Sequence, residues 1–313
     1  MRVLVTGGAG FIASHLVDAY LERGDQVLVI DDFSSGSSKN LSSKAELVEL
    51  SLLDDRIEKI VQAFKPDLIN HHAAQKSVRD SVYDPKKDAD INIIGLLKLM
   101  EAAKSTPCRQ VLFASSGGAI YGEQEEFPAN ESHVTKPLSP YGISKLSSEH
   151  YLRFYSESFR FRATALRYAN VYGPRQDPLG EAGVIAIFCS RLLENKPLTI
   201  YGTGEQTRDF VFVRDVVRAN LLAEKQEHPF IEINIGTQKE SSVLELTKNL
   251  FQISNQAENL KFEERKPGEQ DRSILDISLA KSILSWSPEV QLLEGLRQTY
   301  QWFQREKTDL QSP

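Results

Sequence analysis

Short apolar runs alternate with amphipathic stretches through the first half of the chain. The runs are rich in Val, Ile and Leu and predict buried strands: "RVLVT", "QVLVID", "ELVEL", "DLINHHA", "QVLFAS" and "ATALRY". Between them, apolar residues recur at helical spacing and predict helices over about 10–23, 54–64, 85–104 and from Pro140 onward. Because strands that alternate with helices connect by right-handed crossovers, the pattern predicts a parallel sheet with helices on both faces.

The regular alternation ends after about Asn170. The stretch "VYGPRQDPLGEAG" is rich in Gly and Pro and indicates a loop. Beyond it the pattern predicts short strands and helices near 183–195, 213–225, 241–254, 278–285 and 290–305. We therefore expect an α/β protein: a doubly wound parallel sheet of Rossmann type over residues 1–170, and a smaller C-terminal α/β lobe over 171–313. The chain is expected to cross back to the first domain near 203–236.

The segment "FSSGSSKNLSSK" at 33–44 is the one biased stretch in the chain. Its composition is that of a flexible linker. Its position directly after the second strand instead favours a loop at the carboxyl end of the sheet, where parallel α/β folds bind ligands. We interpret it as a loop.

The overall composition argues against several classes of protein. The 313 residues are 41% hydrophobic, which is enough for a large core. The 37 basic and 43 acidic residues are intermixed, so we expect neither nucleic acid nor membrane as a partner. Cys108 and Cys189 lie far apart and predict neither a disulfide framework nor a metal site. No apolar run approaches the ~20 residues of a membrane helix, and "MRVLVT" reads as a strand rather than a secretory signal. We expect a cytoplasmic protein.

The first strand leads into a glycine turn that is typical of a dinucleotide site. "VTGGAGFIASHL" places Gly7, Gly10 and Ala13 between a strand and a helix. The glycines allow a tight turn and a close approach of backbone to a pyrophosphate, whose charge the helix N-terminus attracts. Asp31 ends the second strand at about the ~20-residue offset expected for a ribose-binding acid. Since a carboxylate repels a 2′-phosphate, we predict NAD rather than NADP; the alternative is a plain glycine-rich turn with an exposed Asp.

A Tyr–Lys pair supplies candidate proton chemistry. In "SPYGISKLSSEHY", Pro140 begins a helix, so Tyr141 and Lys145 lie one turn apart on the same face. A free tyrosine has a pKa near ~10, and a neighbouring ammonium favours the phenolate and lowers that pKa. A phenolate can accept a proton from a sugar hydroxyl while hydride leaves the same carbon. Such spacing also occurs by chance on surfaces, but the glycine turn and the "SS…YG" strand end favour the functional interpretation.

Together these motifs resemble the extended short-chain dehydrogenase/reductase family, in its nucleotide-sugar epimerase and dehydratase branch. The resemblance covers nearly the whole chain and rests on "TGGAGFIAS", "SSGGAIYGE", "YGISK", "LRYANVYGPRQ", "YGTGEQTRDFVFVRD" and "KPGEQDRSILDISLAKSILSW". It implies NAD as cofactor and a UDP-hexose as substrate. It also implies a homodimer through a four-helix bundle of helices 85–104 and 140–159, whose apolar positions include Leu96, Leu97, Leu99, Met100, Leu146, Tyr151 and Phe154; the alternative is that both helices only cover the sheet.

The resemblance implies a set of cofactor contacts. They are Gly7, Gly10, Phe11, Ile12, Asp31, Asp32, Ser34, Ser35, Leu52, Ala73, Ala74, Lys76, Asn92, Tyr141, Lys145 and Tyr168. Asn92 is equally well explained as a polar core residue. The family often has an acid before the third-strand turn, where this chain has Ser51 followed by Leu52, so we expect weaker side-chain contacts to adenine. The His71–His72 pair lacks the neighbours of a metal site.

The resemblance also implies substrate contacts. They are Asn170, Val184, Tyr201, Arg208, Arg265, Lys266 and Ser273. Arginine suits a diphosphate because its planar fork can bond two phosphate oxygens. The resemblance implies that Ser273 occupies the position that controls the space around the sugar C2 substituent. Because its side chain is small, we expect room for an N-acetyl group, and hence activity on both UDP-glucose/UDP-galactose and the N-acetylhexosamine pair.

The strand end "FASSGGAIYGE" bears on the type of reaction. Eliminating water from a sugar needs an additional acid and base. Family members that do so resemble one another in carrying such groups two to four residues before the tyrosine that corresponds to Tyr121. This chain has Gly117, Gly118 and Ala119 there, which favours C4 epimerisation through a 4-keto intermediate. Ser116 is the candidate hydrogen-bonding partner of the sugar 4-hydroxyl and Ser115 is equally well structural. Another nucleotide-sugar dehydratase or reductase, or a non-catalytic NAD-binding protein, is the alternative.

Overall fold

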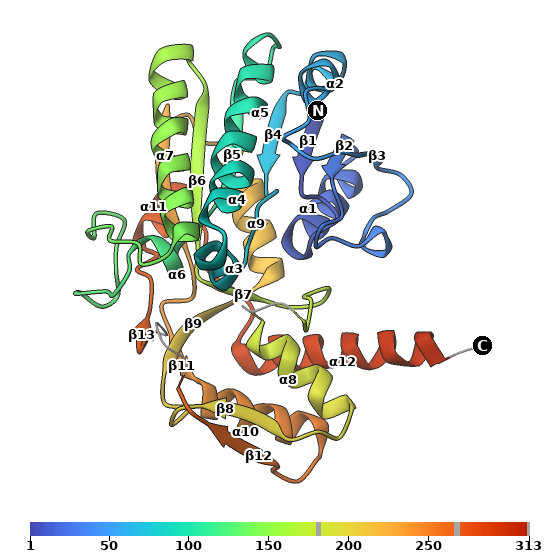
Figure 1. The fold of residues 1–313 in the computed structure, drawn as a ribbon, viewed down its shortest axis with the longest axis vertical. Coiled ribbons are helices and arrows are strands. Elements are labelled where there is room, and N and C mark those ends of the chain that lie inside the picture. Colours follow the sequence, from blue (N-terminus) through green and yellow to red (C-terminus); the bar gives the residue numbers. More distant parts are fainter. Residues whose placement is uncertain (180–182, 266–269, 312–313) are drawn as a thin grey trace.

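A seven-stranded sheet is the main feature of the computed structural model, which describes residues 1–179, 183–265 and 270–311. All neighbouring strands in this sheet are parallel. In spatial order the strands are β10 (Phe230–Ile235), β6 (Arg162–Tyr168), β5 (Gln110–Ser116), β4 (Leu68–His71), β1 (Arg2–Thr6), β2 (Gln26–Asp31) and β3 (Glu46–Glu49). The predicted Rossmann-type fold is confirmed (Figure 1).

Helices cover both faces of this sheet, and each covered face has its own core. One core lies against α1 (Phe11–Glu22), α9 (Val213–Ala223) and α11 (Ser278–Leu284). The other lies against α2 (Ile57–Phe64), α5 (Gly95–Lys104) and α7 (Pro140–Phe159). Val3 and Val5 belong to the first core and Leu4 to the second, as alternation along a strand requires. Burial on both faces explains why the inner strands read as continuous apolar runs, whereas the edge strand β3 is mostly exposed.

The helix expected over 85–104 is divided in the structure. It is preceded by α3 (Val78–Tyr83) and consists of α4 (Pro85–Ala89), a π-helical turn η2 (Asp90–Ile94), and α5. The turn contains Asn92, whose carbonyl oxygen accepts a hydrogen bond from the Ser148 hydroxyl of α7 (3.1 Å). Similarly, the glycine turn expected after β5 is one helical turn, α6 (Gly117–Ile120).

The remaining elements form a smaller lobe. Its strands are β7 (Asn170–Tyr172), β9 (Thr207–Phe212), β11 (Glu240–Ser242) and β13 (Arg272–Ser273) in one sheet, and β8 (Leu198–Tyr201) with β12 (Leu260–Glu263) in another. Its helices α8 (Val184–Leu193), α10 (Val243–Ser254) and α12 (Leu292–Gln311) share a third core. A short 3-10 turn, η1 (Ser38–Asn40), lies in the loop after β2.

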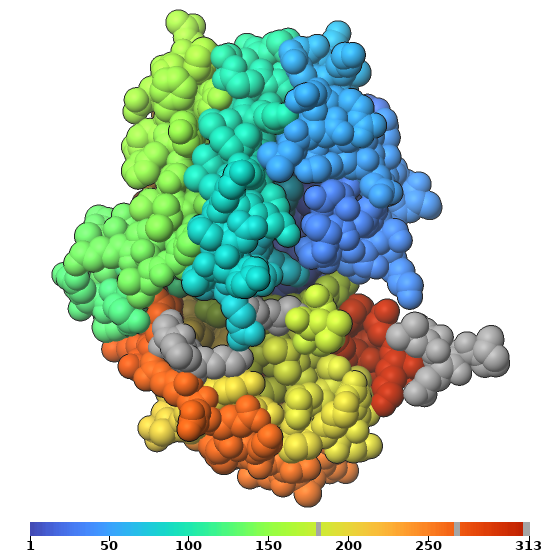
Figure 2. All heavy atoms as spheres, in the orientation of Figure 1, coloured from blue at the N-terminus to red at the C-terminus, as the bar shows by residue number. Residues whose placement is uncertain are grey.

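The chain passes between the large sheet and the lobe more than once. β9 belongs to the lobe, α9 packs on α1, and β10 pairs with β6 in the large sheet before β11 returns to the lobe (Figure 1). The division at residue 170 therefore stays a sequence-based proposal. Figure 2 shows that the surface is hollowed where the two parts meet, beside α3. Within the described ranges, no helix has the length and apolar character needed to span a bilayer.

Candidate active site

The first glycine turn brings β1 against the end of β4. Gly7 has φ +68°, a left-handed conformation that favours glycine. A Cβ on Gly7 would lie 2.6 Å from the backbone nitrogen of Ala73, so only hydrogen fits there. Gly10 donates its N–H to the Gly7 carbonyl (3.0 Å) and begins α1 without a side-chain cap. The first-turn N–H groups, beginning with Phe11 and Ile12, stay available to an anion at this end of the helix.

Asp31 ties the end of β2 to the same turn. Its carboxylate accepts the N–H groups of Ala9 (2.9 Å) and Phe33 (2.8 Å). Burial raises the pKa of Asp31, while these two bonds act to lower it. A carboxylate has more acceptor sites than these bonds use, so Asp31 can also accept from a ribose hydroxyl.

The serine-rich loop lies beside Asp31. Asp32 accepts the N–H of Ser34 (2.9 Å), and both Ser34 and Ser35 are exposed. The loop folds back onto the glycine turn, because the N–H of Ser37 donates to the carbonyl of Ala9 (3.0 Å). The segment is therefore a packed loop and not a linker.

The glycine turn, the start of α1 and the Asp31 carboxylate together fit a dinucleotide. Other predicted contacts differ in their surroundings. Ala73 and Ala74 are half-buried directly after β4, and Lys76 is exposed. Leu52 belongs to the core beneath α5.

The catalytic candidates meet at the end of β5. Tyr141 lies in the first turn of α7 and forms a side-chain hydrogen bond with Ser116, the last residue of β5. Lys145 is buried, and its ammonium donates to the Ala114 carbonyl (2.8 Å). Its Nζ atom lies 5.8 Å from the centre of the Tyr141 ring. Because Ala114 and Ser116 flank Ser115, one strand end holds both candidate side chains.

The pKa of Tyr141 differs in direction from the sequence-based expectation. Burial raises the pKa of Tyr141 to about 12, while the hydrogen bond to Ser116 lowers it and the nearby Asp88 carboxylate raises it. Burial also lowers the pKa of Lys145 to about 8, against the attraction of Asp88 and Glu149. In the protein alone, desolvation therefore outweighs the expected effect of the ammonium.

Asp88 is a site residue that sequence reasoning missed. Its carboxylate is fully buried and accepts from Ser144 (2.6 Å), Gln75 (2.9 Å) and Asn92 (3.0 Å). Asn92 also binds the backbone of Gln75 through both its amide oxygen (2.9 Å) and its amide nitrogen (3.0 Å). Asn92 thus holds the segment after β4 in place. The sequence carries no local signal for Asp88, because its partners Gln75 and Ser144 come from separate segments.

The predicted contact Tyr168 belongs to a buried group at the end of β6. Its hydroxyl contacts the Nε2 atom of His72 (3.2 Å) and accepts from Asn220 (2.8 Å). Burial raises the pKa of Tyr168 and lowers the pKa values of His71 and His72 to about 3. Both imidazoles are therefore neutral at pH 7. The Nδ1 atom of His71 forms a hydrogen bond with the Thr6 hydroxyl (2.6 Å), which is consistent with a structural role for His71.

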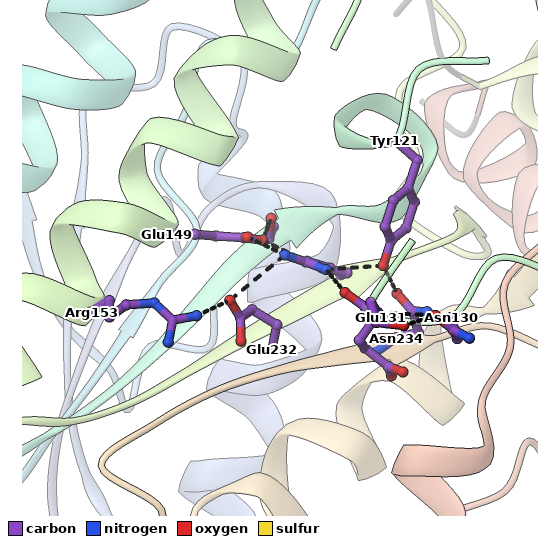
Figure 3. A network of polar contacts seen from close by, with 10 residues as sticks. Tyr121, Asn130, Glu131, Glu149, Arg153, Glu232 and Asn234 are labelled. Atoms are coloured by element: carbon purple, nitrogen blue, oxygen red, sulfur yellow. Dashed lines mark hydrogen bonds and ion pairs between the residues drawn. The ribbon is translucent and has the colours of Figure 1, made fainter. Parts of the chain in front are cut away.

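The two serines of β5 have separate partners. The Ser115 hydroxyl donates to Glu149 (2.5 Å), which lies one helical turn after Lys145 on α7. Glu149 in turn binds Arg167 of β6 (Figure 3). Of the alternatives left open by the sequence, the geometry favours Ser116 as the partner of Tyr141 and a structural role for Ser115.

Three of the predicted substrate residues lie on β7, β9 and β13, which belong to one sheet of the smaller lobe. Asn170 begins β7, and its side-chain oxygen would be 3.8 Å from a Cβ on Gly118. Arg208 and Ser273 are paired neighbours in β9 and β13. Arg208 donates to the Gln270 carbonyl (2.8 Å), and Ser273 is buried.

Three further predicted substrate contacts lie elsewhere in the lobe. Val184 begins α8 and Tyr201 ends β8. Arg265 pairs with Asp271 (2.7 Å). Lys266 lies outside the described residues.

Gly117 packs against Leu275, which belongs to segment 273–276 at the end of β13, called the substrate segment below. A Cβ on Gly117 would lie 2.6 Å from Cδ1 of Leu275 and 3.2 Å from the Arg167 carbonyl oxygen. A side chain at this position would require Leu275 to move. Packing therefore disfavours any side chain at Gly117, acidic or otherwise.

The similarity of the chain to known proteins agrees with this geometry. A putative UDP-glucose 4-epimerase of Methanocaldococcus jannaschii is 42% identical over 301 residues, covering 96% of this chain and 97% of the relative. A UDP-glucose 4-epimerase of Thermotoga maritima, solved with UDP-glucose, superposes with a TM-score of 0.96 at 45% identity over 98% of this chain and 100% of that chain. The Thermus thermophilus UDP-glucose 4-epimerase, solved with NAD, gives a TM-score of 0.92 at 40% identity over 97% and 99%.

The family profile described as "NAD dependent epimerase/dehydratase family" matches residues 3–236. That range holds the glycine turn, the acid of β2, and the Tyr141–Lys145 pair. The chain therefore belongs to the NAD dependent epimerase/dehydratase family.

Proposed function

We propose that this protein catalyses NAD-dependent epimerisation at C4 of a UDP-hexose, through a transient 4-keto sugar. The observation that carries the proposal is the convergence of Tyr141, Ser116 and Lys145 at the end of β5, two strands from the glycine turn of β1 at the same edge of the sheet. The similarity to UDP-glucose 4-epimerases over nearly the full chain supports it. Bound NAD supplies a hydride acceptor that can return the hydride to the sugar.

Tyr141 is the proposed base for the sugar 4-hydroxyl. Its hydroxyl is held by Ser116, so the two oxygens can share a proton with a sugar hydroxyl placed between the strand end and α7. Lys145 adds a positive charge that is fixed by the Ala114 carbonyl. That charge favours the phenolate of Tyr141 when a proton must leave the sugar.

The residues after Ser116 support epimerisation over elimination. Gly117, Gly118 and Ala119 carry no proton-transferring group, and Leu275 fills the space at Gly117. An epimerase needs no group there, since its ketone only rotates and receives hydride on the other face. A dehydratase would need a base and an acid near the sugar ring.

The small side chain of Ser273 supports a broad substrate range. Ser273 is buried next to Arg208, so its size decides how much of the neighbouring space a C2 substituent could fill. We propose turnover of both UDP-glucose/UDP-galactose and the N-acetylhexosamine pair. Ser273→Tyr should then abolish turnover of the N-acetyl pair and retain that of the smaller pair.

A substrate panel tests the proposal directly. Purified protein would be assayed for bound NAD, then incubated with UDP-glucose, UDP-galactose and their N-acetyl counterparts, with products analysed by NMR. Epimeric pairs without net NADH support the proposal. Stoichiometric NADH release would identify a reductase or dehydrogenase, and NAD binding without turnover would identify a non-catalytic protein.

We also propose that the protein forms a homodimer through the α5 and α7 side. Leu96, Leu99 and Met100 are fully buried in the monomer core, so they cover the sheet. Tyr151 and Phe154 of α7 are instead 40% and 50% exposed and support an interface. Light scattering should give twice the chain mass, and Phe154→Glu should give the monomer.

A further inference from the structure

A buried ion pair that the proposed chemistry does not use lies behind the catalytic strand. The side chains of Arg167 and Glu149 are 4% and 2% exposed. Arg167 donates through Nε to Oε1 of Glu149 (3.0 Å) and through Nη2 to Oε2 (2.6 Å). A buried pair with two such bonds is geometrically rigid, because both groups are oriented at once. The pair therefore holds α7 and β6 in a defined position relative to each other.

The sheet register places Arg167 in the middle of a row that crosses three strands, while Glu149 reaches it from α7. Ser115 of β5 is aligned with Arg167 of β6, and Arg167 with Asn234 of β10. Residues aligned in this way point to the same face of a sheet. Arg167 thus lies on β6, between the catalytic strand β5 and the edge strand β10, and is aligned with Ser115, the residue before Ser116.

A second set of bonds leads from Arg167 away from the catalytic helix. Arg167 donates through Nη1 to the Tyr121 hydroxyl (3.1 Å) and to the Glu131 carbonyl (3.1 Å). The Tyr121 hydroxyl donates to the Asn234 side-chain oxygen (2.8 Å). Asn234 donates through its amide nitrogen to the carbonyls of Ala129 (3.1 Å) and Asp276 (3.1 Å). One hydroxyl, that of Tyr121, joins the ion pair to the amide that holds these two carbonyls.

One of the two carbonyls held by Asn234, that of Asp276, belongs to the segment that carries Ser273, and the other, that of Ala129, belongs to a neighbouring segment. Ala129 exchanges backbone bonds with the Ser273 segment, accepting from Asp276 (2.8 Å) and donating to Ile274 (3.0 Å). The N–H of Ile274 also donates to the side chain of Gln124 (3.0 Å). Ser273 itself pairs with Arg208 of β9. The network therefore connects α7 to the residues proposed to contact the nucleotide sugar.

We propose that Arg167, Tyr121 and Asn234 are positioning residues that hold segment 273–276 against the catalytic strand end, and that they set the affinity for the nucleotide sugar rather than the rate of chemistry. The inference rests on the proposed function for its substrate. Tyr141, Lys145 and Ser116 keep their own bonds when the Tyr121 hydroxyl is removed, so kcat should change little. Asn234 loses the bond from the Tyr121 hydroxyl that orients its amide toward the Asp276 carbonyl, so segment 273–276 is held less firmly and binding should weaken.

Tyr121→Phe is the variant that isolates this link. It removes one buried hydroxyl, keeps the ring and leaves the Arg167–Glu149 pair intact. We expect KM for the UDP-sugar to rise about 3- to 10-fold, the range that one buried hydrogen bond supports, with kcat within about twofold. Tyr155→Phe is the matched control, because it removes a tyrosine hydroxyl of α7 that donates to Glu101 (2.6 Å), outside the network. The control should leave both constants within about twofold.

Hydrogen exchange and UDP binding test the positioning role without a measurement of enzyme activity. Hydrogen exchange should increase in peptides covering 122–131 and 270–277 for Tyr121→Phe and not for Tyr155→Phe. Calorimetry with UDP should show weaker binding for Tyr121→Phe by a similar factor. If the wild type epimerises no sugar, the proposed function fails, while exchange and UDP affinity still test the positioning role.

Several results would overturn the inference. An unchanged KM in Tyr121→Phe, a loss confined to kcat, or an equal effect in the control would each do so. Asn234→Ala removes both carbonyl attachments and should raise KM at least as much as Tyr121→Phe. If neither variant folds, the network serves folding and not positioning.

Discussion

Ser115 and Ser116 are adjacent at the end of β5, yet their side chains bond to different residues of α7. Ser115 donates to Glu149 (2.5 Å), and Ser116 bonds to Tyr141. Ser116→Ala should lower kcat about tenfold, since it removes the bond that lowers the pKa of Tyr141. The measurement is steady-state epimerisation together with NAD content, which should be unchanged.

Ser115→Ala is the companion variant with the opposite expectation. Glu149 keeps its two bonds to Arg167, so the catalytic end of β5 should stay in place. Turnover should remain close to wild type, while the free energy of unfolding falls by about 1 kcal/mol. A larger loss of turnover in Ser115→Ala than in Ser116→Ala would reverse the two assignments.

Tyr141→Phe tests the proposed base. The ring remains in place, but no phenolic oxygen is left to accept the proton from the sugar. Turnover should fall about 10²- to 10⁴-fold, the usual contribution of a positioned acid or base. NAD content, measured after denaturation by chromatography, should match the wild type. Wild-type turnover in this variant would exclude Tyr141 as the base.

The sequence predicts the large sheet well because the physics of its strands is local. Strands buried on both faces must be apolar throughout, so each run is visible without knowledge of its neighbours. The glycine turn and Asp31 are visible for a similar reason, since their spacing along the chain sets their positions at the strand ends. The Tyr141–Lys145 pair follows from helical spacing alone.

The parts that the sequence did not predict depend on contacts between distant segments. Asp88 acquires its role from Gln75 and Ser144, which lie on separate segments, as well as from Asn92 four residues further along the same helical stretch. The direction of the Tyr141 pKa shift depends on burial by the whole fold, which outweighs the nearby ammonium. Spacing shows which residues are neighbours on a helix and does not show how much water they lose.

Lys145→Met should separate stability from activity. Burial lowers the pKa of Lys145 from 10.5 to about 8, so at pH 7 the folded protein holds a charge that it disfavours. That shift corresponds to about 3 kcal/mol, and the lost bond to the Ala114 carbonyl offsets about 1 kcal/mol. The inactive variant should therefore be about 2 kcal/mol more stable than the wild type at pH 7.

The pH dependence of this difference has a defined sign. Between about pH 8 and 10.5 the unfolded wild type binds a proton at Lys145 that the folded protein has released, so wild-type stability rises with pH. The advantage of Lys145→Met should shrink across this window in urea unfolding series. Lys136→Met is the control, because Lys136 is exposed and its variant should show no such trend. A pH-independent advantage for Lys145→Met would contradict the proposed burial of charge.

Gly117→Ala tests whether packing against Leu275 keeps the strand end free of side chains. A Cβ at this position would lie 2.6 Å from Cδ1 of Leu275, so the substrate segment must shift. We expect a loss of about 1–3 kcal/mol in the free energy of unfolding, as overpacking costs, and a raised KM for the UDP-sugar. Gly118→Ala is the matched control, because its nearest contact is the Asn170 side-chain oxygen at an ordinary 3.8 Å.

A double-mutant cycle identifies Leu275 as the cause of that loss. Leu275→Ala alone should cost about 2–5 kcal/mol, since it leaves a cavity beside α6. In that background Gly117→Ala should cost nothing further, because its methyl group enters the vacated space. The two changes would then be non-additive by about 1–3 kcal/mol, as residues in contact can be. If the two losses of unfolding free energy are additive, the strain comes instead from the Arg167 carbonyl oxygen. That oxygen lies 3.2 Å from the same Cβ, and neither substitution removes it.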